Sequence, residues 1–133
     1  MKIIRYQDSA GEVLHGVQHD TGATRLDGCL LGDHQDSGEP ADLQKLLAPV
    51  QPMDILCIGL NYRRHAEEGG SDIPEHPILF MKTSSSVQNP GDPIILPRQL
   101  RSDAVDFECE LAVVIGTECK NVDAENALDH VLG

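Results

Sequence analysis

Apolar and polar residues alternate over short runs in the first 50 residues of the chain, and turn-forming residues separate these runs. Alternation with a period of two is typical of strands that bury one face. It predicts strands over three segments, which are residues 2–7, 12–18 and 24–31. A turn at Ser9-Ala10-Gly11 is expected to join the first two strands.

The remainder of this first part is polar until residue 41. Residues 32–40 are rich in Gly, Asp and Ser and are expected to form turns. Apolar residues then recur at positions 41, 43, 46 and 47. With Asp42 near its start, this spacing predicts a short helix over residues 41–47. Pro49 and Pro52 mark a boundary after it.

Continuous apolar runs replace the alternation beyond this boundary. Residues 55–60 read Ile-Leu-Cys-Ile-Gly-Leu, which is typical of a strand covered on both faces. Further strands are expected over three segments, residues 77–82, 94–96 and 106–116. Residues 63–68 favour one or two helical turns. Residues 123–132 favour a helix with Asp123 as its N-cap and Glu125 in its first turn.

These elements indicate an α+β chain that is mainly β. We expect a small β-rich domain over residues 1–50 and a second unit over residues 51–133. Few strands of the second unit have a partner that would complete a sheet, and the pattern stops at Gly133, where elsewhere a further strand would follow. The 133 residues are therefore expected to be part of a longer protein.

The net charge of the chain excludes some classes of binding partner. The formal net charge is -12, from 22 Asp and Glu against 10 Lys and Arg. This argues against nucleic acid or an anionic membrane, because both require clustered positive charge. No signal peptide is visible at the start, and no apolar run approaches the roughly 20 residues of a membrane span. We expect a cytoplasmic protein, and the acidic balance suits a bound cation.

Four cysteines are present, and none has the CxxC spacing of a zinc site. Each lies beside apolar residues. We interpret them as buried free thiols in a reducing compartment rather than as a disulfide framework or a zinc site.

The segment Asp106 to Gly116 carries the first candidate chemistry. On a strand, Glu108 and Glu110 point to the same face, about 7 Å apart. The apolar run that follows indicates a buried strand, where two carboxylates would repel each other unless a cation joined them. Carboxylate oxygens favour Mg²⁺, Mn²⁺ or Ca²⁺ over zinc. The alternative is an ordinary pair of surface glutamates.

A second constellation places His65 before Glu67 and Glu68, between a predicted strand and the pair Gly69-Gly70. On a helix, Glu68 lies at i+3 from His65 and can pair with it. A carboxylate beside an imidazole raises its basicity and orients it, which suits a general base. The alternative is an exposed histidine on a charged helical turn.

Lys82 ends the predicted strand over residues 77–82 and could meet a substrate carboxylate, although a solvent-exposed lysine is an equally good interpretation. Neither GxGxxG nor GxxxxGK occurs, so a phosphate-binding loop of these types is absent. Ser84 to Ser86 lack the GxSxG context of a serine nucleophile.

These motifs, in this order, resemble the fumarylacetoacetate hydrolase family. The resemblance covers residues 53–133 nearly continuously, and residues 1–50 resemble the variable N-terminal domain that many members carry. The matching segments are Ile55 to Tyr62, His65 with Glu68, Pro77 to Lys82, Pro90 to Ile94, Asp106 to Gly116, and Asn126 to Gly133.

The resemblance implies a mixed β-roll domain, usually as a homodimer, with Mg²⁺, Mn²⁺ or Ca²⁺ bound. Glu108 and Glu110 would be two metal ligands, and the third would be an aspartate beyond Gly133. His65 and Glu68 would form the catalytic dyad, and Lys82 would bind substrate. The implied substrate is a 2-oxo or β-diketo acid that reacts through a metal-bound enolate, with hydrolytic C–C bond cleavage as the foremost reaction.

One position departs from the pattern of members that cleave simple acylpyruvates. Those members often have arginine where this chain has Leu60, and leucine offers no cation to a carboxylate. This favours the branch associated with isomerase, hydratase or ureidoglycolate lyase-like proteins. Isomerisation, decarboxylation or lyase chemistry on the same substrates therefore stays open. A non-catalytic fragment that acts as a binding or interface module is a further alternative, and so is an unrelated domain that shares these motifs by coincidence.

Overall fold

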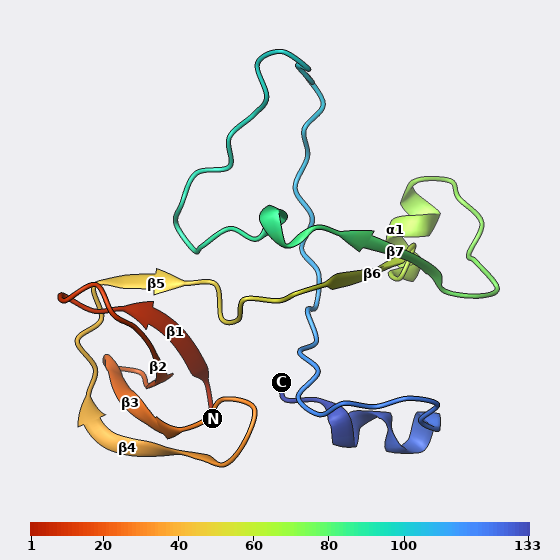
Figure 1. Ribbon diagram of the computed structural model, residues 1–133. Coiled ribbons are helices and arrows are strands. Elements are labelled where there is room, and N and C mark those ends of the chain that lie inside the picture. Colours follow the sequence, from red (N-terminus) through yellow and green to blue (C-terminus); the bar gives the residue numbers. More distant parts are fainter.

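The computed structural model describes residues 1–133 and is mainly β, as predicted (Figure 1). Its larger sheet is antiparallel, with the strand order β4-β3-β2-β1-β5. The strands are β1 (Ile3–Gln7), β2 (Val13–Gln18), β3 (Ala23–Gly28), β4 (His34–Pro40) and β5 (Lys45–Leu47). The three strands expected before residue 32 are thus confirmed, to within a few residues at their ends.

Two predictions in this part are wrong. Residues 34–40 form β4 instead of turns, because they pair with β3 around an irregularity between Thr24 and Leu26. The helix expected over residues 41–47 is replaced by β5. There the backbone N–H of Gln44 donates to the carbonyl of Gln7, and residues 45–47 pair with the edge of β1. Pairing along a whole strand edge outweighs a weak local helix preference.

The core of this sheet is small and lies on β1, β2 and the chain after β5. Its buried apolar side chains are Ile4, Tyr6, Val17 and Ala48. Gly16 pairs with Ile4, and a Cβ at Gly16 would lie 3.2 Å from the Tyr6 ring and 2.6 Å from the Thr24 carbonyl oxygen. The absence of a side chain at Gly16 is therefore what allows Tyr6 to pack across β2.

A second sheet consists of two antiparallel strands, β6 (Ile55–Gly59) and β7 (Ile78–Lys82), in which Ile55 pairs with Lys82. This pair of strands is called the β6–β7 hairpin. The helix α1 (Arg63–Glu68) follows β6 and ends at Gly69. Both strands and the helix occupy the segments that the sequence predicted. The strand over residues 55–60 was expected to be covered on both faces, but Leu56 in β6 is 64% exposed, and Leu79 and Met81 in β7 are 63% and 61% exposed.

The first sheet and the segment that follows β7 are joined by a polar contact. Lys45 Nζ in β5 lies 2.7 Å from Asp92 Oδ2, and the backbone N–H of Ala48 donates to Asn89 Oδ1 at 3.0 Å. Asn89 in turn donates to Asp92. The turn at residues 89–92, which the Asp92 N–H closes by donating to the Asn89 carbonyl, is thereby fixed against β5. The hydrogen bonds from Lys45 and Asn89 lower the pKa of Asp92 below its ordinary value.

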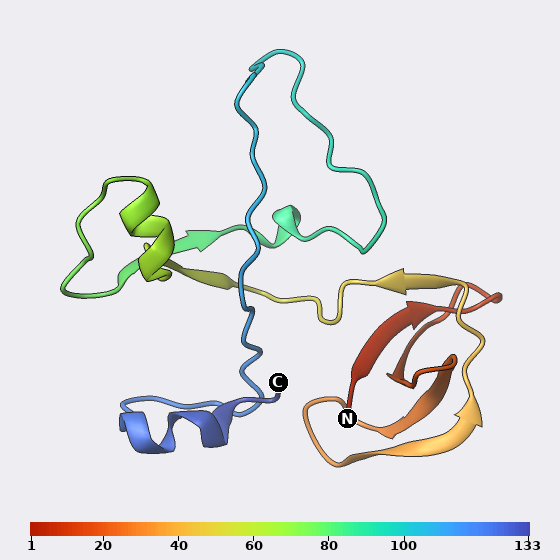
Figure 2. The same ribbon diagram turned by 180° about the vertical axis from the view of Figure 1, so that it is seen from behind.

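The long segment after β7 contains one short 3₁₀ turn, η1 (Ser84–Ser86), and then projects away from both sheets before it returns past the hairpin (Figures 1 and 2). The strands predicted over residues 94–96 and 106–116 are wrong for most of their length. Only Ile115 forms a bridge, with Val131. A strand requires a hydrogen-bonding neighbour along its length, and residues 94–96 and 106–113 have none in this chain.

The last residues fold back on the end of this segment. The 3₁₀ helix η2 (Ala124–His130) replaces the helix predicted over residues 123–132, with Asp123 at its N-cap position and Glu125 in its first turn. Backbone hydrogen bonds of 2.8 Å then connect Val114 with Leu132 and Gly133, and Gly116 with His130. No helix in the structure is long and apolar enough to cross a membrane.

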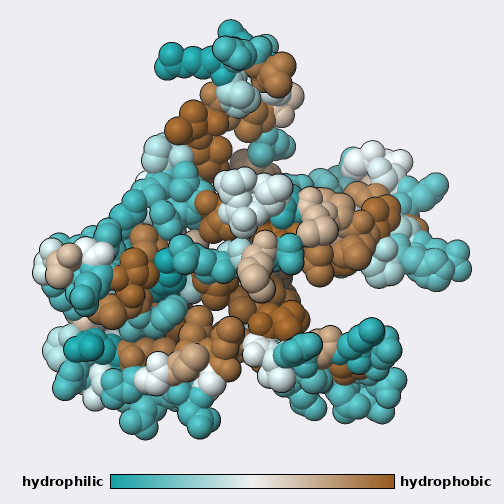
Figure 3. Space-filling model, viewed as in Figure 1, coloured by the Kyte–Doolittle hydropathy of each residue, from teal (hydrophilic) through white to brown (hydrophobic).

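The solvent-accessible surface is large for a chain of this size. It measures 11120 Å², whereas a compact folded protein of the same mass exposes about 6,900 Å². Hydrophobic side chains gather over the β6–β7 hairpin in Figure 3. The cysteines are free, as predicted, but none is buried: Cys57 is half-buried, and Cys29, Cys109 and Cys119 are exposed.

Candidate functional site

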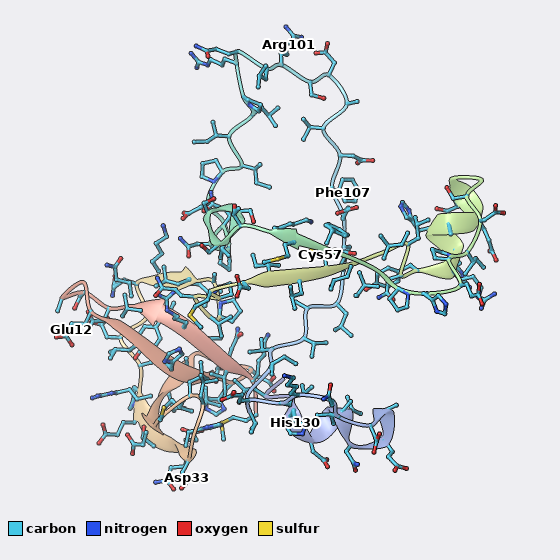
Figure 4. The ribbon with its side chains drawn as sticks, turned by 45° about the vertical axis from the view of Figure 1, so that its right-hand side comes forward. Glu12, Asp33, Cys57, Arg101, Phe107 and His130 are labelled. Carbon is cyan, nitrogen blue, oxygen red and sulfur yellow. The ribbon has the colours of Figure 1, made fainter.

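The segment that carries Glu108 and Glu110 crosses the β6–β7 hairpin (Figures 1 and 2). In Figure 4, Phe107 lies on this segment near the point where it passes Cys57 in β6. Both glutamates are exposed. The expectation of a buried strand is therefore wrong in this chain, because no neighbouring strand covers the segment.

Lys82 and Glu108 come together at this crossing. Lys82 Nζ, at the end of β7, lies 3.8 Å from Glu108 Oε2. Their side chains are 45% and 65% exposed, so the ion pair is solvated and contributes little to stability. The ion pair matters for the arrangement of the site, because it places the ammonium group of Lys82 beside the carboxylate of Glu108.

His65 and Glu68 lie on α1, one helical turn apart, and both are exposed. The structure contains no hydrogen bond between their side chains. The helix is held in place by Ala66, which is 1% exposed and is the only buried apolar residue after residue 50. The two residues predicted to form a dyad thus lie on one short helix, and their side chains are not hydrogen-bonded to each other.

A hydrogen bond connects the start of α1 to the carboxylate segment. The backbone N–H of Leu111 donates to the phenol oxygen of Tyr62 at 2.8 Å. Leu60 precedes it with φ of 50°, in the left-handed region that bulky residues rarely adopt. This turn redirects the chain from β6 into α1. The sequence pattern includes Tyr62 in the matching segment Ile55 to Tyr62 but assigns it no role.

The carboxylates of Glu108 and Glu110 are the type of ligand that a hard divalent cation prefers, but two of them are too few to form a complete site. Glu108 and Glu110 offer carboxylate oxygens, which Mg²⁺, Mn²⁺ and Ca²⁺ prefer. No group of three or more His, Cys, Asp or Glu side chains in the chain is arranged to hold a metal ion. Residues 1–133 therefore offer two carboxylates on this segment, and Lys82 contacts one of them.

A cavity of about 420 Å³ lies elsewhere, between the first sheet and the turn after β7. Arg5, Val50, Ser84 and Asn89 are among the residues that line it. None of the five predicted site residues does. The candidate site is therefore an open surface beside the hairpin, which the chemistry of its side chains identifies rather than the shape of a cleft.

The chain belongs to the fumarylacetoacetate hydrolase family. The sequence model of the fumarylacetoacetate (FAA) hydrolase C-terminal domain matches residues 54–133, which is more than half of the chain. This is the family that the order of the sequence motifs predicted. The match includes all five candidate residues.

Characterised and uncharacterised members are among the relatives. A Dictyostelium discoideum protein described as a fumarylacetoacetate hydrolase domain-containing protein 2 homolog is 47% identical over 94 residues, which is 71% of this chain and 30% of that protein. A mitochondrial oxaloacetate tautomerase of Xenopus laevis is 48% identical over 89 residues, which is 66% of this chain and 27% of that protein.

Solved structures match the whole chain. The crystal structure of a 2-hydroxyhepta-2,4-diene-1,7-dioate isomerase from Mycobacterium marinum has a TM-score of 0.80 and is 30% identical, and the match covers 100% of this chain and 51% of that one. The family fold is thus confirmed. The chain spans about half the length of this solved relative and roughly a third of the two curated relatives.

Proposed function

We propose that the protein is a divalent-metal-dependent enzyme that moves a proton at the carbon next to the keto group of a 2-oxo or β-diketo acid. The observation that carries this proposal is the convergence of Lys82, the Glu108–Glu110 pair and the start of α1 beside one hairpin. The tautomerase and isomerase named among the relatives support proton transfer as the reaction type.

Each of the five residues has a role in this proposal. Lys82 binds a substrate carboxylate, which offsets the repulsion that an anion meets near a chain with a net charge of -12. His65 accepts the proton from the carbon between the two carbonyl groups and returns it at another position. Glu68 orients the imidazole once α1 has closed over the substrate.

Glu108 and Glu110 would hold Mg²⁺, Mn²⁺ or Ca²⁺. Such a cation, when bound, supplies Lewis-acid polarisation of the substrate carbonyl. The remaining ligand implied by the family resemblance lies outside residues 1–133. We also propose that the protein is a homodimer, as the resemblance implies.

Hydrolytic cleavage of a C–C bond is the second candidate. It is favoured by the exposure of His65, because a base that is open to solvent can take a proton from water as readily as from carbon. Leu60 argues for proton transfer instead, since it provides no cation where acylpyruvate-cleaving members often have arginine. The two reactions share Lys82 and the carboxylate pair and differ in the atom that His65 deprotonates.

The test is a comparison of two reactions on the full-length protein. Enol oxaloacetate and an acylpyruvate are each incubated with enzyme and Mg²⁺, and the loss of the enol and diketo absorbance is followed with and without EDTA. We expect Mg²⁺-dependent ketonisation of oxaloacetate and slow cleavage of the acylpyruvate. Faster cleavage of the acylpyruvate would favour the hydrolase. Inactivity toward both would favour a binding or interface module.

A further inference from the structure

Tyr62 accepts two hydrogen bonds, one at its backbone carbonyl and one at its side chain. Its carbonyl accepts the Ala66 N–H at 3.2 Å and so begins the helix that carries His65 and Glu68. Its phenol oxygen accepts the N–H of Leu111, the residue directly after Glu110. Tyr62 therefore joins the start of α1 to a residue that lies 49 positions further along the sequence.

The second of these contacts acts on the backbone of Glu110. The Glu110 carbonyl and the Leu111 N–H belong to the same planar peptide unit. A hydrogen bond at the N–H therefore fixes the orientation of that unit and limits the rotation of the Glu110 backbone. Within residues 1–133, Tyr62 supplies the only hydrogen bond to the backbone of residues 108–113 from another part of the chain.

We propose that Tyr62 is a positioning residue that sets the distance between the base on α1 and the carboxylate pair. This inference rests on the proposed function, because it assigns Tyr62 a role through Glu110 and His65. The ring is 41% exposed, so the hydroxyl group acts without contributing to a buried core. The positive φ of Leu60 assists, because it turns the chain so that Tyr62 faces the returning segment.

The test is Tyr62→Phe in the full-length protein, with Tyr6→Phe as the matched control. Both substitutions remove one phenol oxygen, and the chain has two tyrosines. The Tyr6 hydroxyl is buried without a hydrogen-bond partner, so its loss should leave activity unchanged. We measure kcat, KM, the Kd of Mn²⁺ and the hydrogen exchange of the Leu111 amide.

We expect Tyr62→Phe to lower kcat by about 3- to 10-fold, to raise the Kd of Mn²⁺ by a similar factor and to speed exchange at Leu111, with KM changed less than about twofold. Wild-type values of kcat and Kd in Tyr62→Phe would overturn the proposal, and so would a variant that does not fold. Glu110→Ala distinguishes a failure of the role of Tyr62 from a failure of the proposed function. If it is inactive while Tyr62→Phe is normal, only the role of Tyr62 fails, whereas full activity in Glu110→Ala means that the proposed function itself is wrong.

Discussion

The first sheet and the region around the β6–β7 hairpin differ in how completely each buries its own apolar residues. Four of the five buried apolar side chains lie before residue 50, and only Ala66 lies after it. Of the large hydrophobic residues that are exposed, 4 lie before residue 50 and 19 lie from Met53 onward. The first sheet has its own small core, whereas the hairpin has paired strands with both faces open.

The buried core and the candidate site residues lie in different regions of the chain. All five candidate site residues lie in the region without a core, on exposed positions that make few packing contacts. Substituting them should change activity and leave the fold intact. Substitutions in the first sheet should do the reverse. The predictions below use this difference, from the largest expected effect to the smallest.

His65→Ala should lower kcat by about 10²- to 10⁴-fold, the usual contribution of a general base. Because His65 is exposed on α1, the melting temperature should stay within a degree or two of the wild-type value. Steady-state kinetics and thermal unfolding of the same sample check both statements. His76→Ala, at another exposed histidine, is the control. An unchanged rate in His65→Ala would leave this residue as a surface histidine.

Gly16→Ala should lower stability and leave activity unchanged. The new Cβ would lie 2.6 Å from the Thr24 carbonyl oxygen, so β2 and β3 must shift. We expect the free energy of unfolding to fall by about 1–3 kcal/mol, as for other overpacked sites, with kcat of the folded protein unchanged. Gly69→Ala is the matched control, since its Cβ would meet no atom closer than 3.4 Å. Urea unfolding that shows equal stability for both variants would contradict the packing described for Tyr6.

Lys82→Met should strengthen metal binding and weaken substrate binding. Loss of the Lys82–Glu108 ion pair removes a cation that competes with a metal ion, so the Kd of Mn²⁺ should fall by up to about fivefold. The KM for an anionic substrate should rise at the same time. Mn²⁺ titration and steady-state kinetics give the two values, with Lys120→Met as the control. A KM that does not rise would remove Lys82 from the substrate site.

Acid should weaken the first sheet slightly. Hydrogen bonds from Ser9 and Gln44 hold the pKa of Asp42 below its ordinary value of 3.8. The folded state therefore binds a proton at Asp42 less readily than the unfolded state. The stabilisation is present above pH 3.8 and is lost as the pH falls through the lower pKa of the folded state. The urea midpoint between pH 6 and pH 2.5 should fall less steeply in Asp42→Asn than in the wild type or in Asp20→Asn.

Elements that depend on local pattern could be predicted from the sequence. Alternation located β1 and β2, and the apolar run from Ile55 located β6. The fold family followed from the order of several short motifs, each of which is ambiguous alone. In these cases the information lies within about ten residues, where side-chain periodicity directly reflects backbone geometry.

Elements that depend on distant partners could not be predicted. Residues 41–47 have a helical spacing, yet the free edge of β1 binds them as β5. The apolar run after Glu110 has the composition of a buried strand, yet only its end, at Val114 and Ile115, pairs with another segment of residues 1–133. The contact between Tyr62 and Leu111 has no counterpart in local sequence, because it joins residues that only the folded chain brings together.

The central claim is that Glu108 and Glu110 bind one divalent cation, and Mn²⁺ titration of the full-length protein tests it most directly. Wild type, Glu108→Gln and Glu110→Gln are compared by calorimetry, with Glu118→Gln as the control for the lost negative charge. We expect one Mn²⁺ per chain in the wild type and in Glu118→Gln, and an affinity at least about tenfold weaker in each of the other two variants. Equal Mn²⁺ affinity in all four proteins would contradict the assignment.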